Sequence, residues 1–136
     1  MRKVKLLYVI TKLELGGAQK QLLFLLRHLN RERFQVFLFT GTEGLLKEEA
    51  FSIPDLSIVT SRFLERPIHP IKDFLAFLQL YWVMRRKRIE IVHTHSSKAG
   101  ILGRFAAVCA GVTSIIHTVH GWSFNDYQGN IQRKLF

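Results

Sequence analysis

The stretch "VKLLYVITKLELGGAQKQLLFLLRHL", residues 4–29, joins an apolar run to a leucine-rich run through two adjacent glycines. Residues 3–10 are rich in valine, leucine and isoleucine, which is typical of a strand buried on both faces. From residue 18 to residue 30, leucines recur at helical spacing. The stretch therefore predicts a β-strand followed by an α-helix, with Gly16 and Gly17 at the turn between them.

The rest of the chain repeats this alternation of strand and helix. Further strands are predicted over 34–41, 55–60, 89–96 and 114–121, further helices over 71–88 and 98–110, and the start of another helix over 130–136. Apolar strands separated by helices of this length indicate a parallel sheet that is covered on both faces. We expect an α/β, Rossmann-like doubly wound parallel sheet with helices on both faces.

The helix predicted over 98–110 carries two further signals. Ser96 or Ser97 suits the position that caps its beginning, and Gly111 suits the residue after its end. Small residues fall near one face and would let the helix lie close to the sheet: Ala99, Gly103, Ala106, Ala107 and Ala110.

Length and composition limit the classes of protein. The 136 residues fit one domain, and 20 Lys and Arg against 10 Asp and Glu give a net charge of +10, which favours phosphate-bearing partners. The single cysteine, Cys109, excludes a disulfide framework, and its apolar surroundings predict a buried, inert thiol. The apolar run near the N-terminus is too short for a signal peptide, and no apolar segment reaches the roughly 18 residues of a membrane span.

The chain stops at Phe136, inside a predicted helix. A doubly wound domain normally continues to a sixth strand. We therefore expect residues 1–136 to form a single, truncated domain with some apolar surface left bare.

Ligands of such sheets bind beyond the carboxyl ends of the strands, where the winding direction reverses. With a strand order of 3-2-1-4-5, the loops after strands one and four would meet there. Glycines at a helix N-terminus let a phosphate approach the backbone, although Gly16 and Gly17 could also merely permit a tight turn. The pair is part of neither G-x-G-x-x-G nor a P-loop, which disfavours a nicotinamide cofactor and a nucleotide triphosphate.

Histidines gather at the same edge. His93 and His95 lie two apart on a predicted strand, and His117 and His120 lie on or just after the next strand. Three histidines can bind zinc, but no Cys, Asp or Glu close in sequence completes a shell, so we expect no metal. An imidazole that acts on a hydroxyl or a phosphate is the better hypothesis, and His120, followed by a glycine, is the best placed.

Two further segments are candidates for the same crevice. Lys98 falls in the first turn of a predicted helix, where it either faces the crevice or is a solvated lysine. The segment "WSFNDY" interleaves aromatic side chains with amides, which suits sugar binding through Trp122 and Asn125. A rim loop that packs on its own aromatic residues is an equal alternative.

Three segments together resemble one family: "LELGGAQKQLLFLLRHL", "IVHTHSSKAGILGRFAA" and "IIHTVHGW". In order and spacing they are similar to the N-terminal half of family 4 glycosyltransferases, of the bacterial surface-polysaccharide type. The family consists of retaining, metal-independent enzymes with two Rossmann-like domains, the arrangement called GT-B. The resemblance implies a cytoplasmic enzyme that uses a nucleotide-sugar donor and a glycan or lipid-linked acceptor and needs no cofactor. The inner face of the cytoplasmic membrane is one expected place of action.

The resemblance also implies roles for individual residues. Gly16 and Gly17 correspond to the glycine pair that approaches the donor diphosphate, and His120 to a catalytic histidine near the transferred sugar. The acceptor side would comprise His95, Ser96, Lys98, Trp122 and Asn125. The donor-binding C-terminal domain with its paired glutamates is absent from these residues, so we expect the chain alone to be inactive.

Two other functions compete with this one. Residues 73–88, "DFLAFLQLYWVMRRKR", combine apolar and aromatic side chains with four terminal cations, a composition that suits a non-catalytic peripheral module on an anionic membrane surface. A buried crossover helix is the alternative for this segment. Nucleic acid is not an expected partner, because the chain has no recognisable motif for it and most of its basic residues are dispersed.

Overall fold

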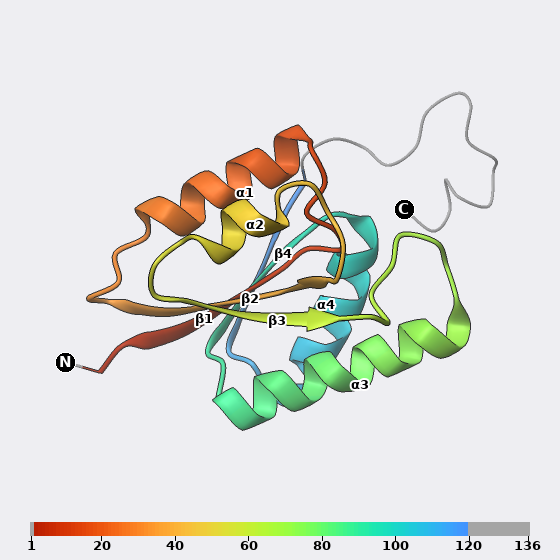
Figure 1. Ribbon diagram of the computed structural model, residues 1–136. Coiled ribbons are helices and arrows are strands. Elements are labelled where there is room, and N and C mark those ends of the chain that lie inside the picture. The colour runs from red at the N-terminus through yellow and green to blue at the C-terminus, as the bar shows by residue number, and fades with distance from the viewer. Residues whose placement is uncertain (1, 120–136) are drawn as a thin grey trace.

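The computed structural model describes residues 2–119, which form one five-stranded sheet and four helices. In chain order the elements are β1 (Val4–Val9), α1 (Gly17–His28), β2 (Phe34–Gly41), α2 (Lys47–Phe51), β3 (Leu56–Ser61), α3 (Pro70–Lys87), β4 (Ile91–His95), α4 (Ser97–Ala110) and β5 (Ser114–Thr118). All neighbouring strands are parallel, and their order is β3-β2-β1-β4-β5 (Figure 1). The predicted fold class is confirmed, and the strand order is the one on which the expected position of the crevice depends.

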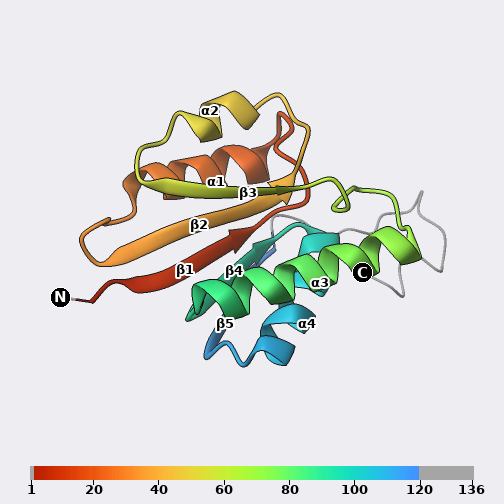
Figure 2. The same cartoon turned by 60° about the horizontal axis from the view of Figure 1, so that its bottom comes forward.

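The helices cover both faces of the sheet. Helices α1 and α2 lie on one face and α3 and α4 on the other (Figures 1 and 2). Side chains of β1 alternate between the two cores: Leu7 and Val9 pack with α3 and α4, whereas Leu6 and Ile10 pack with α1 and α2. Because β1 is central and buried on both sides, it has the continuous apolar sequence that predicted it.

Helix α4 lies close to the sheet through its small residues, as predicted. Ala99, Gly103, Ala106, Ala107 and Ala110 are all buried. A Cβ added to Gly103 would come within 2.6 Å of Thr94 Cγ2 on β4, and one added to Gly100 would come within 2.6 Å of the His117 ring. Larger residues at these two positions would force the helix away from β4 and β5.

Two sequence-based expectations differ from the structure. The five-residue helix α2 was not predicted, because it is too short to show helical periodicity. The prediction that Cys109 is buried is wrong: the side chain is exposed. It lies on the face of α4 opposite the sheet, together with exposed Phe105 and Val108.

Apolar side chains are also exposed on β5, at Ile115 and Ile116, and just after it at Val119. The helix predicted over 130–136 lies outside the described residues, and the expected sixth strand stays a prediction. Within residues 2–119, no helix is both long and apolar enough to span a bilayer.

Candidate functional site

The carboxyl ends of β1 and β4 are adjacent at the point where the winding direction reverses. Thr11, just after β1, contacts Ser96, just after β4: the two hydroxyl oxygens are 2.9 Å apart, and the Thr11 backbone N–H donates to Ser96 Oγ at 3.3 Å. The loops that lead into α1 and α4 are thereby joined. This is the crevice that the strand order predicts as the ligand site.

Gly16 and Gly17 begin helix α1. Gly16 is the capping residue with extended backbone, no side chain caps the helix, and its first turn holds no acidic residue. A Cβ on Gly17 would meet nothing within 4 Å, and one on Gly16 would meet chiefly the flexible end of Gln19. Neither glycine adopts positive φ. Packing and backbone conformation thus require no glycine at residue 17 and only weakly favour one at residue 16, which weighs against the tight-turn alternative.

Ser96 has a strained backbone. Its φ of 70° and ψ of 160° fall in a region that residues other than glycine almost never occupy. It takes the N-cap position of α4, as predicted, but its hydroxyl makes no capping hydrogen bond and contacts Thr11 instead. Strain of this kind concentrates at functional sites, and here it lies at the winding reversal.

His93 and His95 form a packed cluster with Tyr8 below the rim, whereas the His117 ring lies against Gly100 and contacts Thr94. The ring centroids of His93 and His95 are 4.3 Å apart, and that of Tyr8 is 5.1 Å from His93 and 5.9 Å from His95. His93 Nε2 lies 2.5 Å from Thr118 Oγ1 on β5. His95 is completely buried, and burial raises the pKa of the Tyr8 hydroxyl above its ordinary value. His95 therefore supports the rim from below, and a direct acceptor contact by this residue stays a prediction.

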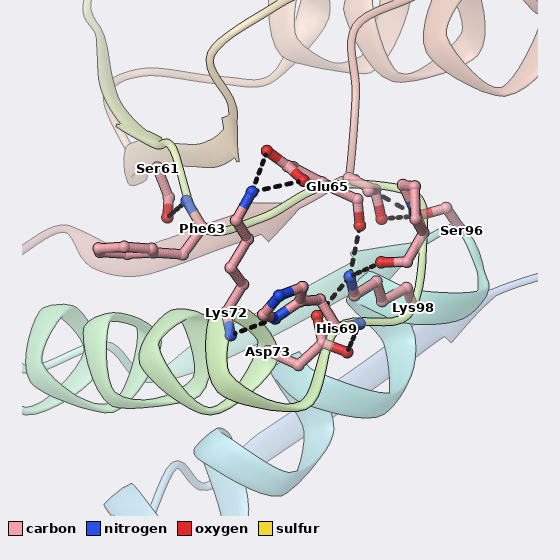
Figure 3. Close-up of polar contacts among 10 residues, drawn as sticks. Ser61, Phe63, Glu65, His69, Lys72, Asp73, Ser96 and Lys98 are labelled. Atoms are coloured by element: carbon pink, nitrogen blue, oxygen red, sulfur yellow. Dashed lines mark hydrogen bonds and ion pairs between the residues drawn. The ribbon is translucent and has the colours of Figure 1, made fainter.

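Lys98 contacts the loop between β3 and α3. Its ammonium donates to the backbone oxygens of Glu65 at 2.5 Å and Pro67 at 2.6 Å, and it forms an ion pair with Asp73 on α3 (Figure 3). The Lys98 side chain is only 10% exposed. Lys98 is therefore not a solvated lysine, because it holds a neighbouring loop. A contact between Lys98 and the acceptor stays a prediction.

The same β3–α3 loop reaches the loop before the glycine pair. Arg66 forms an ion pair with Glu14, two residues before Gly16. A cavity of about 220 Å³ lies between these segments and the end of β2. Its lining residues are Thr11, Lys12, Gly41, Thr42, Glu43, Leu64, Glu65, Arg66 and Pro67. The sequence reasoning missed this loop, although its place after a strand of the same sheet was a usable signal.

Three of the residues singled out by sequence, His120, Trp122 and Asn125, lie outside the described part of the chain. Of the other candidates, His95 and Ser96 lie at the end of β4, and Ser96 contacts the loop after β1 that leads to Gly16 and Gly17. Lys98 contacts the β3–α3 loop instead. Helices α1 and α4 both begin at the edge of the sheet where β1 and β4 end, and neither has an acidic residue in its first turn. Two helix N-termini without acidic residues form an edge with positive potential that suits an anion.

The comparisons with known proteins agree on a family. The model of Glycosyltransferase Family 4 matches residues 15–136, and the chain belongs to that family. It is 38% identical over 128 residues to the Escherichia coli UDP-Gal:alpha-D-GlcNAc-diphosphoundecaprenol alpha-1,3-galactosyltransferase, covering 90% of this chain and 31% of the relative. It is 26% identical to the Escherichia coli O-antigen biosynthesis glycosyltransferase WbnH, covering 95% of this chain and 35% of that relative. The chain thus spans about a third of the length of these relatives.

Solved structures share the fold. A glycosyltransferase from Rickettsia africae superimposes with a TM-score of 0.72 at 17% identity, covering 98% of this chain and 33% of that chain. The Anabaena protein HepE, in complex with UDP and glucose, superimposes with a TM-score of 0.68 at 16% identity. The match covers 97% of this chain and 34% of the HepE chain. The Rossmann-like sheet is therefore similar to one part of longer glycosyltransferases.

Proposed function

We propose that this chain is the acceptor-side half of a retaining glycosyltransferase, which moves a sugar from a nucleoside-diphosphate sugar to a glycan or lipid-linked glycan. The Escherichia coli galactosyltransferase at 38% identity has a name that states a UDP-sugar donor and a diphosphoundecaprenol-linked acceptor, which supports both classes of substrate. On this proposal the enzyme works in the cytoplasm, at the inner face of the membrane that carries the acceptor.

The observation that carries the proposal is the glycine pair at the start of α1. Backbone N–H groups at a helix N-terminus bind phosphate, and glycine lets the phosphate come close. The loop that leads to the pair begins at Thr11, which contacts the strained Ser96, and the family resemblance assigns the pair to the donor diphosphate. Gly17 has open space where a Cβ would lie, so packing does not require glycine there, and this supports a ligand at that position.

The mechanism follows from the charge that develops during transfer. As the bond between the sugar and the nucleoside diphosphate breaks, negative charge grows on the leaving phosphate. The N–H groups of α1 would stabilise that charge electrostatically, together with cations contributed by a second domain. By resemblance, His120 would lie near the transferred sugar, and Ser96, Trp122 and Asn125 would contact the acceptor.

The division of labour between two domains can be tested by transfer assays with radiolabelled UDP-galactose and a diphosphoundecaprenol-linked acceptor. We expect no turnover by the 136-residue chain alone and turnover when a donor-binding domain is joined to it. Turnover by the chain alone would contradict the division between two domains. No transfer from any nucleotide sugar by the joined protein would contradict the proposed reaction.

A further inference from the structure

The outer face of α3 carries an apolar stripe that runs most of the length of the helix. Its members are Ile71, Phe74, Leu78 and Trp82, which are 69%, 60%, 36% and 62% exposed. The spacing of three, four and four residues places them on one side of the helix. Helix α3 lies along the lower margin of the molecule in Figure 1 and at its front in Figure 2, with no other helix or strand drawn in front of it there. We call these four residues the α3 stripe.

Cations extend the α3 stripe at its C-terminal end. Arg85 and Arg86 follow Trp82 by three and four residues, and all of residues 85–88, "RRKR", are exposed. No acidic residue occurs between residues 74 and 88. The acidic residues that flank this segment in sequence already form ion pairs: Asp73 pairs with Lys98, and Glu90 pairs with Arg2. The outer surface of α3 is therefore apolar along the α3 stripe, and at its C-terminal end it carries positive charge that no acidic side chain of the helix neutralises.

We propose that the α3 stripe and the adjoining arginines are a docking surface for an anionic phospholipid bilayer. An interfacial helix immerses its apolar side chains at the boundary between headgroups and acyl chains, while arginine contacts anionic headgroups. Tryptophan prefers that boundary, because its ring is apolar and its N–H is polar. The exposed arginines without acidic neighbours favour an anionic membrane over a second copy of this basic chain.

The orientation of α3 fits this role. The helix runs antiparallel to the strands, so its first turn, next to Ile71, is at the rim with the candidate site, and its arginines are at the opposite end of the sheet (Figure 2). A chain that lies on α3 therefore keeps the rim beside the membrane. This inference concerns binding alone, and its test does not depend on glycosyl transfer.

The test is co-sedimentation of the 136-residue chain with vesicles of phosphatidylcholine, with and without phosphatidylglycerol. We expect binding to the anionic vesicles, and weaker binding as salt shortens the Debye length from about 10 Å to about 3 Å. Arg85→Gln with Arg86→Gln should lower the partition coefficient by roughly thirtyfold, which corresponds to about 1 kcal/mol for each of the two cations. Phe74→Ser with Trp82→Ser should abolish binding.

Matched control variants use the other parts of the surface. Phe24 on α1 is 59% exposed on the opposite face of the sheet, so Phe24→Ser removes a similar ring. Lys3 and Arg33 are exposed cations near the amino ends of the strands, so Lys3→Gln with Arg33→Gln removes the same charge. Both controls should bind vesicles within about twofold of the wild type, an allowance that corresponds to roughly 0.4 kcal/mol.

Tryptophan fluorescence gives a second readout. In a Trp122→Phe background only Trp82 emits. Its emission should move to shorter wavelength with anionic vesicles and be quenched by brominated lipid. Equal losses in the α3 and control variants, an unchanged Trp82 emission, or concentration-dependent dimerisation that the α3 variants alone abolish would each overturn the proposal.

Discussion

Lys98 at the start of α4 and Asp73 in the first turn of α3 form an ion pair whose side chains are only 10% and 18% exposed. With the backbone oxygens of Glu65 and Pro67, this pair fastens the β3–α3 loop to α4 (Figure 3). The loop in turn reaches Glu14 through Arg66. Three segments that are distant in sequence are thus joined beside the candidate site: the start of α4, the β3–α3 loop and the loop before α1.

Lys98→Met should destabilise the protein by about 3 kcal/mol, because it leaves the Asp73 carboxylate without its main partner in a poorly hydrated place. Urea unfolding measures the change, and amide exchange should quicken in residues 62–69. Lys72→Met is the matched control: its ion pair with Glu65 is 40% and 45% exposed, and its loss should cost less than about 1 kcal/mol. Equal losses in the two variants would contradict a structural role for Lys98.

Ser96 allows a test of backbone strain. Ser96→Ala loses the contacts with Thr11 and keeps the strain, whereas Ser96→Gly loses the same contacts but relieves it. After the greater flexibility of unfolded glycine is subtracted, Ser96→Gly should be more stable than Ser96→Ala by about 1 kcal/mol. Thermal unfolding of the two variants measures the difference, and an alanine variant as stable as the glycine variant would exclude strain.

The lowered pKa of Glu90 predicts part of the loss of folding stability in acid. Its carboxylate accepts hydrogen bonds from the Lys5 backbone N–H at 2.8 Å and Arg2 Nη1 at 2.6 Å, and in that order these partners lower its pKa below the ordinary 4.5. The folded state then binds fewer protons than the unfolded state. The stabilisation is present above pH 4.5 and is lost as pH falls through the lower folded pKa.

Glu90→Gln should therefore lose less stability than the wild type between about pH 7 and about pH 3. Urea midpoints across this range measure the slopes. Parallel curves for the two proteins would show that Glu90 does not contribute to the pH dependence.

The glycines differ in what the fold demands of them. A Cβ on Gly41 would lie 2.6 Å from the Leu64 backbone oxygen and 2.7 Å from that of Thr11, so Gly41→Ala should cost about 1–3 kcal/mol. Gly17→Ala meets open space in a helical position and should leave stability unchanged or raise it by up to about 1 kcal/mol. Chemical denaturation measures both changes in stability. If Gly17→Ala is destabilised, packing rather than a ligand requires glycine at this position.

The sheet could be predicted from sequence because its signals are local and strong. The apolar run that forms β1, the helical leucines of α1 and the small-residue face of α4 each determine their element within a short window. The strand order followed from one expected winding reversal. Helix α2 was missed because five residues are too few to show a period.

The site was only partly predictable, since its contacts join distant segments. Sequence reasoning placed Gly16 and Ser96 at one rim, and the structure brings the loops that carry them together there. It could not foresee that Lys98 binds backbone oxygens some thirty residues earlier, or that His95 is buried under that rim. Cys109 was assigned wrongly because an apolar window does not reveal which helix face meets the sheet.

The central claim is that the N-terminus of α1 binds the diphosphate of a nucleotide sugar. The most direct measurement is a titration of the 15N-labelled chain with UDP, with uridine as the matched ligand that lacks phosphate. We predict that UDP shifts the backbone amide signals of Gly17 and Ala18, that uridine leaves them unchanged, and that Gly17→Val, with its bulky side chain at the phosphate position, abolishes the shifts. Equal shifts with UDP and uridine, or UDP shifts at Gly17 and Ala18 no larger than those elsewhere, would contradict the claim.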